Sequence, residues 1–469
     1  MKKLSFKQIT ALTLSFALTA GIFTGCGKKA TDKDEEGRTI VTVGNWPSKE
    51  GAELDNANAN KKRFEKDNPD VVIEGDAYTF ERKTFYAKAA GGQLPIVYET
   101  AYTEVPEIIN SGYSADLTDV LNKRGYKGMF NEKILELVSK DGKILAFPKN
   151  AYIFGLGCNM DIMKKAGLIN EDGTPKQPKD WYEMAEFAVR IKEKTGKPGF
   201  VIPTSANCGG WMYMPIAWSF GVDFMEQNKD GKWQATFDTK EAVEALQFIK
   251  DLKWKYDVLP ANSLIDPTEY YKTIGTNGAG MYIIPGDYSG NVSQYGMDVN
   301  ALGAMAMPAG PKRHVTLLGG AVQCVSNNAT ADQIDASVRW LETMYNYKAT
   351  DAFKEAINRR YETKIANKHH IGIKAMSPWS SNSEGLAYEH SVIDKMANAD
   401  LAHVKLYNDF VANCPADIQP EEPACCQELY AILDGCIQEV LTNKNADCAK
   451  LIKNAAKDFQ KNYLDNLTY

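Results

Sequence analysis

The chain has 469 residues, of which 44% are hydrophobic and 24% charged, and its formal net charge is −6. This composition is typical of a folded globular protein with more than one domain, and it excludes disordered, collagen-like and coiled-coil chains. Since nucleic-acid binding needs a basic surface that neutralises phosphates, this mildly acidic chain is not expected to bind nucleic acid.

The N-terminal residues have the features of a secretory signal. Three lysines form a basic start, and the apolar stretch at 9–23 is too short to span a bilayer. The sequence Phe23-Thr24-Gly25-Cys26 then resembles a bacterial lipoprotein cleavage site, at which Cys26 would carry the lipid. We therefore expect residues 1–25 to be a signal peptide and the mature protein to be lipid-anchored on the extracellular face of the bacterial cytoplasmic membrane. An ordinary secretory cleavage site beside a chance cysteine is the alternative.

A tether and then alternating elements follow. Residues 26–38 are small or charged, so they cannot bury apolar area and are expected to be flexible. Strand-like and helical patterns then alternate at 39–43, 53–67, 71–74, 81–90, 95–98 and 103–110. This rhythm predicts an α/β fold with a mostly parallel, doubly wound sheet. A further strand-like run lies at 152–158, and helical patterns recur at 181–194, 240–256, 332–346 and 428–443.

Catalytic signatures are absent from the sequence. It contains no G-x-S-x-G, no H-E-x-x-H, no Walker A motif and no G-x-G-x-x-G after a strand. The adjacent His369 and His370 lie in a lysine-rich stretch that is typical of a solvated surface rather than of a metal site. We therefore expect no enzyme, no metal ion and no cofactor. A carboxylate pair of the glycosidase kind stays open, because acidic residues are plentiful.

Cysteines add no clear signal. Eight lie beyond Cys26, at Cys158, Cys208, Cys324, Cys414, Cys425, Cys426, Cys436 and Cys448. Disulfides are chemically permitted outside the cytoplasm, and free cysteines also pack as small hydrophobic residues. Their spacing leaves both interpretations open.

Aromatic residues beside Gly, Asn, Pro or Asp are the sharpest signal. They fall at expected strand or loop ends and include Trp46, Tyr102, Tyr152, Trp211, Tyr288 and Trp379. Ligands of open α/β sheets bind at the carboxyl ends of strands. A flat aromatic face suits a sugar ring, because the C–H groups of the sugar stack on it while polar neighbours bind the hydroxyls. Core packing is the alternative for each ring taken alone.

Short motifs in a shared order carry a family resemblance. They are FEKDNPDVVI at 64–73, GGQLPIV at 91–97, DGKILAFP at 141–148, NMDIMKKAGL at 159–168 and PKDWYE at 178–183. In this order they resemble the extracellular solute-binding proteins of family 1, the sugar receptors of ABC importers. The resemblance covers nearly the whole mature chain, although Ile96 stands where the family usually has Asp.

The resemblance implies a two-lobed clamshell that closes on its ligand. Each lobe would be a mostly parallel, doubly wound sheet that is discontinuous in sequence. Lobe 1 would comprise 39–150 and 301–348, and lobe 2 would comprise 151–300 and 349–469. The expected ligand is a carbohydrate, in particular an oligosaccharide. The expected partners are two permease subunits and, through them, their ATPase, with the receptor itself a monomer.

The resemblance also implies five ligand contacts in three segments. Tyr102, Thr103 and Glu104 stand where relatives keep polar sugar contacts, but the Asp and Arg of the relatives are Thr103 and Glu104 here. Tyr152 falls on a hinge-side contact, and Trp211 falls on a stacking ring. The pattern of sugar hydroxyls that this chain recognises is therefore expected to differ from that of its relatives.

Four further ligand contacts are expected. Asp287 and Tyr288 correspond to a Gly-Pro-Trp segment of relatives, which would make Tyr288 a second stacking face. Trp46 follows the first predicted strand, where relatives place sugar-binding groups. Trp379 is predicted from its residue type and location alone.

Three rival functions remain at this point. A receptor for a peptide or a polyamine would line its cleft with carboxylates rather than with stacked aromatic rings. A secreted glycoside hydrolase would turn over an oligosaccharide. An adhesion or scaffold lipoprotein would bind no small ligand. The sequence does not identify the sugar or its chain length.

Overall fold

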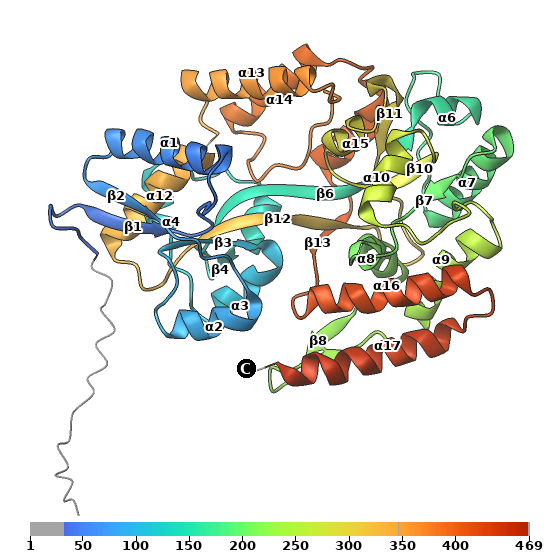
Figure 1. The fold of residues 1–469 in the computed structure, drawn as a ribbon, viewed down its shortest axis with the longest axis horizontal. Coiled ribbons are helices and arrows are strands. Elements are labelled where there is room, and N and C mark those ends of the chain that lie inside the picture. Colours follow the sequence, from blue (N-terminus) through green and yellow to red (C-terminus); the bar gives the residue numbers. More distant parts are fainter. Residues whose placement is uncertain (1–31, 346, 468–469) are drawn as a thin grey trace, which may run out of the picture.

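The computed structural model describes residues 32–345 and 347–467 (Figure 1). The predicted signal peptide and Cys26 lie outside the described residues. Residues 32–38 of the predicted tether make contacts with the folded chain. Lys33 Nζ donates to Thr39 Oγ1 at 2.9 Å and to the Asp332 carboxylate at 2.7 Å. This part of the tether is therefore attached to the fold.

One mixed sheet runs through both halves of the molecule (Figure 1). In one half, β1 (Thr39–Val43) pairs in parallel with β2 (Val71–Gly75) and with β3 (Val97–Ala101). Burial alternates along β1: Thr39, Val41 and Val43 enter the core, and Ile40 and Thr42 on the other face are half-buried. These three strands form the parallel sheet that the sequence predicts for lobe 1.

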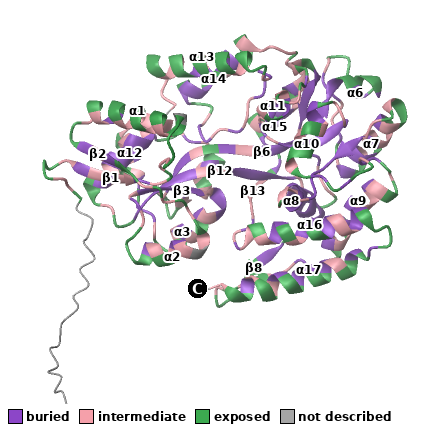
Figure 2. Cartoon of the chain, in the orientation of Figure 1, coloured by how far each residue is buried: buried purple, intermediate pink, exposed green. Residues whose placement is uncertain are grey.

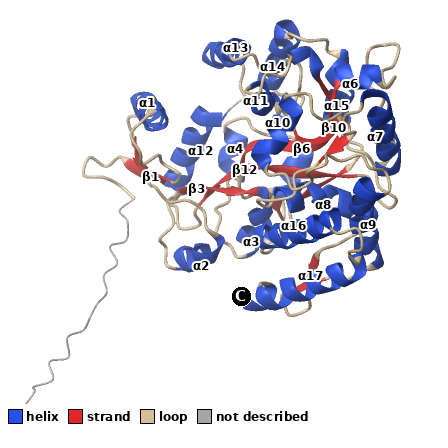
Figure 3. Cartoon of the chain, turned by 45° about the vertical axis from the view of Figure 1, so that its right-hand side comes forward, coloured by secondary structure: helices blue, strands red, loops and turns tan. Residues whose placement is uncertain are grey.

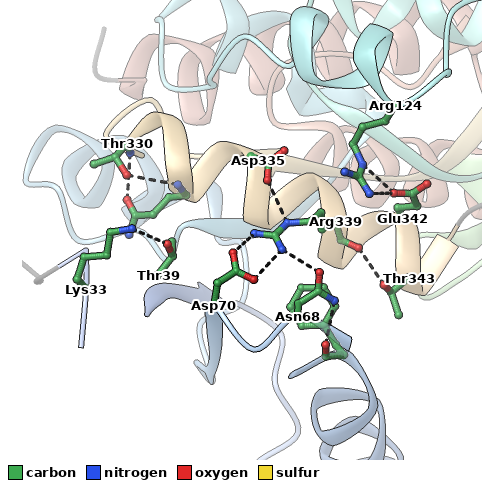
Figure 4. A network of polar contacts seen from close by, with 12 residues as sticks. Lys33, Thr39, Asn68, Asp70, Arg124, Thr330, Asp335, Arg339, Glu342 and Thr343 are labelled. Atoms are coloured by element: carbon green, nitrogen blue, oxygen red, sulfur yellow. Dashed lines mark hydrogen bonds and ion pairs between the residues drawn. The ribbon is translucent and has the colours of Figure 1, made fainter. Parts of the chain in front are cut away.

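Helices cover both faces of this part of the sheet. On one face lie α1 (Ala52–Asp67) and α12 (Ala331–Tyr345), whose Phe64 and Trp340 rings meet edge to face at 5.3 Å. Arg339 of α12 also binds Asp70 and Asn68 after α1, as Figure 4 shows. On the other face lie α2 (Arg82–Ala90) and α3 (Val105–Asn110). Smaller elements follow: α4 (Thr118–Lys123), α5 (Glu132–Leu137) and the hairpin of β4 (Ser139–Lys140) and β5 (Lys143–Ile144).

Two long antiparallel strands cross between the halves. They are β6 (Phe147–Asn159) and β12 (Val315–Val325), and Tyr152 lies opposite Gly319. Because side chains alternate along a strand, Tyr152 and Phe154 share one face of β6, and Ala151 and Ile153 share the other. The antiparallel crossing strands make the sheet mixed rather than mostly parallel.

The second half is built on the far ends of these strands. There β10 (Met281–Pro285) and β11 (Leu302–Met305) pair antiparallel with β6, β7 (Phe200–Val201) pairs in parallel with β10, and β13 (Asp417–Pro420) pairs in parallel with β12. Its helices are α6 (Met160–Lys165), α7 (Trp181–Thr195), α8 (Cys208–Phe220), α9 (Lys240–Trp254), α10 (Pro267–Gly275), α11 (Ser289–Ser293), α15 (Ala402–Asn413), α16 (Cys426–Thr442) and α17 (Cys448–Asn462). A short hairpin joins β8 (Met225–Gln227) to β9 (Trp233–Ala235). Figure 2 shows the strands buried and the outer helix faces exposed.

A helix pair bridges the two halves. Figures 1 and 3 place α13 (Asp351–Ala366) and α14 (Glu384–Met396) on the same side of the sheet as α1 and α12, and opposite α8 and α16. The pair has a small core of its own, which contains Ile357 and Val392. The segment between the two helices also sends Trp379 into the core of the first half. The lobe boundaries themselves stay predictions.

The described cysteines and helices add three findings. All eight described cysteines are free thiols, and five of them are buried. No group of His, Cys, Asp and Glu among the described residues could hold a metal ion. In the same part of the chain, no helix has both the length and the apolar character that a bilayer span needs.

Candidate ligand-binding site

Five predicted contacts meet where the halves join, together with Glu421, which the sequence analysis missed. We call this set the interlobe site: Tyr102, Thr103, Glu104, Tyr152, Trp211 and Glu421. Tyr102–Glu104 form a single helical turn directly after β3. The Tyr152 ring lies on Gly319 of β12, where a Cβ atom would come within 2.1 Å of Tyr152 Cζ. Glycine at this position therefore lets the ring lie flat on the crossing strand.

Trp211 reaches this site from the first turn of α8. Its ring meets Phe154 edge to face at 4.8 Å, and Phe154 stacks against Tyr152 with ring centroids 6.5 Å apart. The Asp434 carboxylate fixes the start of α8, because it accepts the backbone N–H groups of Asn207 and Gly210, both at 2.7 Å. Trp211 and Tyr152 both remain partly exposed. The site therefore offers aromatic surface that the core does not use.

Glu421 connects the two halves. It follows β13, and its carboxylate accepts from Thr103 Oγ1 at 3.3 Å and from Tyr430 Oη at 2.7 Å. Burial raises the pKa of Glu421, while hydrogen bonds from Tyr430, Thr103 and Trp211 oppose the increase. Thr103 follows β3 in the first half, and Glu421 follows β13 in the second half. Their hydrogen bond therefore spans the junction between the halves. No sequence signal pointed to Glu421, because the strand before it, Asp417–Pro420, has only one β-branched residue and glutamates are plentiful.

Glu104 lies within an ion-pair network. Arg82, at the start of α2, pairs with both Glu104 and Glu107. Burial raises the pKa of Glu104, Arg82 opposes this, and the negative charges of Glu107 and Glu421 reinforce it. Glu104 and Glu421 are thus close enough to influence each other's charge. Arg82 was not predicted, because a lysine- and arginine-containing helix start looks like ordinary surface.

Trp46 and Asp287 lie apart from this site. The Trp46 ring stacks on Trp340 at 6.3 Å and lines a cavity of about 400 Å³ together with Lys49 and Glu53, beside the carboxyl ends of β1 and β2. The Asp287 carboxylate pairs with Lys364 Nζ of α13 at 2.6 Å. The pKa of Asp287 is lowered, because the ammonium group of Lys364 and the hydrogen bonds from Ser289 outweigh the effect of burial.

Two predicted stacking rings are core residues, and these predictions are corrected. Tyr288 is fully buried, its hydroxyl lies 2.9 Å from that of Tyr282, and it donates to the carbonyl of Gly303. Trp379 is 1% exposed and stacks on Phe130 at 5.0 Å. Tyr288 offers no face to a ligand, and Trp379 contributes only to the wall of a cavity of about 200 Å³ that Asp287 and Lys364 also line. The presence of an aromatic residue beside Gly or Pro did not distinguish core residues from ligand-binding residues. Packing in the folded chain decides which rings are covered.

The fold and this site define a two-lobed binding protein. Residues 59–361 match the family model of bacterial extracellular solute-binding proteins, and the chain belongs to this family. It is 28% identical over 186 residues to the arabinooligosaccharide-binding protein of Bacillus subtilis, over 39% of this chain and 40% of that protein. It is 25% identical over 235 residues to the sn-glycerol-3-phosphate-binding periplasmic protein of Escherichia coli K12, over 47% of this chain and 51% of that protein. The chain thus matches about half the length of these relatives or less.

Solved structures share the fold. The cyclic α-maltosyl-1,6-maltose binding protein of Arthrobacter globiformis superposes with a TM-score of 0.61 at 21% identity, over 92% of this chain and 100% of that chain. A glycerophosphocholine complex from Mycobacterium tuberculosis also gives 0.61, at 15% identity, over 90% of this chain and 98% of that chain. These neighbours confirm the two-lobed α/β fold. The family and the neighbours are binding proteins, not enzymes.

Proposed function

We propose that the chain binds a carbohydrate at the interlobe site and delivers it to an ABC importer. The observation that carries this proposal is the partly exposed Trp211 ring beside the Glu421 carboxylate, with Glu104 close enough to Glu421 to feel its charge. An aromatic face can stack on a sugar ring, and carboxylates accept hydrogen bonds from sugar hydroxyls. The relative in Bacillus subtilis and the neighbour in Arthrobacter globiformis are named as oligosaccharide- and maltosyl-maltose-binding proteins, which agrees with this ligand class.

Phosphorylated ligands, which other relatives bind, suit this site less well. Recognition of a phosphate group relies on cationic groups that are free to bind its oxygens. Here Arg82 is already engaged by Glu104 and Glu107, and Glu421 adds a further negative charge. The charge balance therefore favours a neutral or cationic carbohydrate over a ligand such as glycerol phosphate.

The same proposal includes the location and the partners. Cys26 would carry the lipid and hold the receptor on the extracellular face of the cytoplasmic membrane. The ligand-bound receptor, a monomer, would dock on two permease subunits whose ATPase drives import. Membership of an extracellular family and the cleavage-site motif before Cys26 support this part.

A ligand screen tests the function. Mono- and oligosaccharides, sn-glycerol 3-phosphate, spermidine and short peptides would be compared by thermal shift, since a ligand that binds only the folded state raises the melting temperature. Calorimetry would then measure the affinity of each ligand that shifts it. We expect a carbohydrate to bind without being consumed. Binding of only glycerol phosphate or peptide, or product formation from an oligosaccharide, would overturn the proposal.

Trp211→Ala tests the site. A stacked aromatic contact contributes about 1 kcal/mol beyond the area that it buries, so affinity for the carbohydrate should fall at least about tenfold. The matched control is Trp254→Ala, which removes another partly exposed tryptophan far along the chain on α9. The control should keep wild-type affinity. Equal affinities in calorimetry for wild type and Trp211→Ala would exclude Trp211 from the site.

A further inference from the structure

The Glu421 carboxylate has no basic partner among the described residues. Its hydrogen-bond donors are the hydroxyls of Thr103 and Tyr430, and the indole of Trp211 also lowers its pKa. All three groups are neutral. A partly buried carboxylate usually has a cationic partner, because removing charge from water costs free energy that neutral donors only partly offset.

The neighbouring acidic groups leave this negative charge uncompensated. Arg82 is shared by Glu104 and Glu107, so these three residues together carry one net negative charge. Glu422 is buried behind Glu421, where its carboxylate accepts from Trp218 Nε1 at 2.8 Å. Burial raises the pKa of Glu422 to about 7, so this group is largely protonated at pH 6, and the excess negative charge of the interlobe site comes from Glu421 and from the Arg82 network.

A second feature of the site is a buried hydroxyl without a partner. Tyr102 is 2% exposed, and its Oη has no hydrogen-bond partner among the described residues. The Tyr102 ring reaches Gly320, the residue after the Gly319 on which the Tyr152 ring lies. Buried polar groups are nearly always hydrogen-bonded in native proteins. Tyr86, Tyr126 and Tyr213 also have buried hydroxyls without a partner in the described chain, so the Tyr102 hydroxyl agrees with a polar ligand but does not require one.

Aromatic faces accompany the uncompensated carboxylate. Trp211 and Tyr152 are partly exposed and are linked through Phe154. The face of a tryptophan ring attracts a cation as well as an apolar ring surface. A ligand with both a sugar ring and a positive charge would therefore satisfy the aromatic faces and the carboxylate together.

We propose that the carbohydrate bound at the interlobe site carries a protonated amino group, as in an amino sugar with a free amine. This inference rests on the proposed function and names its ligand class more closely. The ammonium group lies against Glu421, and the ring stacks on Trp211. A linear polyamine could pair with the same carboxylate, but it has no ring that could stack on the aromatic faces.

Calorimetry with matched sugars tests this inference. Glucosamine and galactosamine, as monomers and short oligomers, would each be compared with the N-acetylated sugar and with the plain hydroxyl sugar of the same linkage. At about pH 6 the free amine is largely protonated, and we expect it to bind at least about tenfold more tightly than either counterpart. The preference should weaken as salt is added, because salt screens charge interactions.

Two variants locate the effect. Glu421→Gln keeps an oxygen that accepts hydrogen bonds but removes the charge, so it should abolish the preference for the amine. Glu422→Gln changes the adjacent buried glutamate and should leave the preference intact. A melting curve for each variant shows whether it is folded before its affinities are compared.

The outcomes separate the inference from the proposed function. Equal binding of amine and hydroxyl sugars, or a preference that survives Glu421→Gln, overturns the inference and leaves a carbohydrate receptor. Binding of spermidine with no binding of any sugar overturns both. A preference for the amine that is lost in Glu421→Gln and kept in Glu422→Gln supports both.

Discussion

The lobes are joined on both faces of the crossing strands, and the two junctions are built differently. On the face that carries Tyr152, a hydrogen bond of 3.3 Å between Thr103 and Glu421 spans the junction. On the opposite face, where Figure 3 places α13 and α14, Lys364 of α13 pairs with Asp287 at 2.6 Å, and Trp379 packs in the core of the first half. One junction is polar and partly exposed, and the other combines packing with an ion pair.

This difference indicates which junction can open. A single hydrogen bond contributes about 1 kcal/mol, whereas a buried tryptophan contributes several times more. Rotation of one domain against another needs only a few residues that change conformation. We therefore expect the interlobe site to open and close while the α13–α14 junction stays closed, with β6 and β12 between them as the hinge.

Trp379→Ala is expected to have the largest effect, because it removes the packing that holds the α13–α14 junction. The ring is fully enclosed between Phe130 and Tyr347, so its loss leaves a cavity. Denaturant unfolding should show a free energy of unfolding lower by about 3–5 kcal/mol. Trp254→Ala, at a partly exposed tryptophan, should cost clearly less. Similar losses in the two variants would show that the α13–α14 junction is not held by packing.

Glu422→Gln tests how a buried carboxyl group beside the interlobe site makes the free energy of unfolding depend on pH. Burial raises the pKa of Glu422 to about 7 from an ordinary value of 4.5. Between these values the folded state holds a proton that the unfolded state has released. The free energy of unfolding of the wild type should therefore fall as pH rises through this range, by about 3 kcal/mol from this group. Urea unfolding at a series of pH values should show a smaller fall in the Gln variant, and identical pH profiles would contradict the prediction.

Lys364→Met removes the ion pair of the α13–α14 junction and keeps an unbranched apolar side chain. It leaves the partly buried Asp287 without its cation. We expect a loss of about 1–2 kcal/mol in thermal or urea unfolding. Lys405→Met breaks a more exposed pair with Asp409 and is the control, with an expected loss below about 0.5 kcal/mol. A loss no larger than that of the control would mean that the ion pair does not hold this junction.

Thr103→Val should have the smallest effect on stability. It removes the hydroxyl that donates to Glu421 and keeps the shape of the side chain. The expected loss is at most about 1 kcal/mol, because one neutral donor is lost from a partly exposed carboxylate. Small-angle scattering without ligand should show a larger radius of gyration for Thr103→Val than for wild type. An unchanged radius would show that this hydrogen bond does not limit opening.

Much of the regular structure could be predicted from local patterns. The strand at Thr39–Val43 and the helices that begin at Trp181 and Lys240 lie where the alternation and the periodicity place them. Asp180 and Thr239 cap these two helices, as Asp and Thr commonly do. Local signals suffice here because hydrogen bonds within an element and one apolar face define it.

The crossing strands and the bridging helices were harder to predict. Local patterns indicated only 152–158 of β6 and did not indicate β12, α13 or α14. The unrecognised part of β6 contains Lys149 and Asn150 among apolar residues. The strand as a whole pairs with β12 in its first part and with β10 and β11 in its last part, so its surroundings change along its length. Such a strand lacks a constant alternation, so local pattern does not reveal it.

The candidate site shows the same division. The sequence placed Tyr102, Thr103 and Glu104 together because they are adjacent, and the resemblance added Tyr152 and Trp211. It could not separate Trp211 from Trp379, since both are tryptophans beside Gly or Pro and differ only in what covers their rings. Nor could it select Glu421 among many glutamates, because its role follows from a contact with Thr103 across 318 positions of the chain.

By itself the sequence thus determined a folded α/β protein and its family, and it predicted the segments that carry ligand contacts. Composition, periodicity and motif order fix these properties because they depend on neighbours along the chain. Only the tertiary structure decided which aromatic rings stay uncovered and that Glu421 has no cationic partner within residues 32–345 and 347–467. Burial and charge pairing arise between residues far apart in sequence, and they exist only once the two halves have folded against each other.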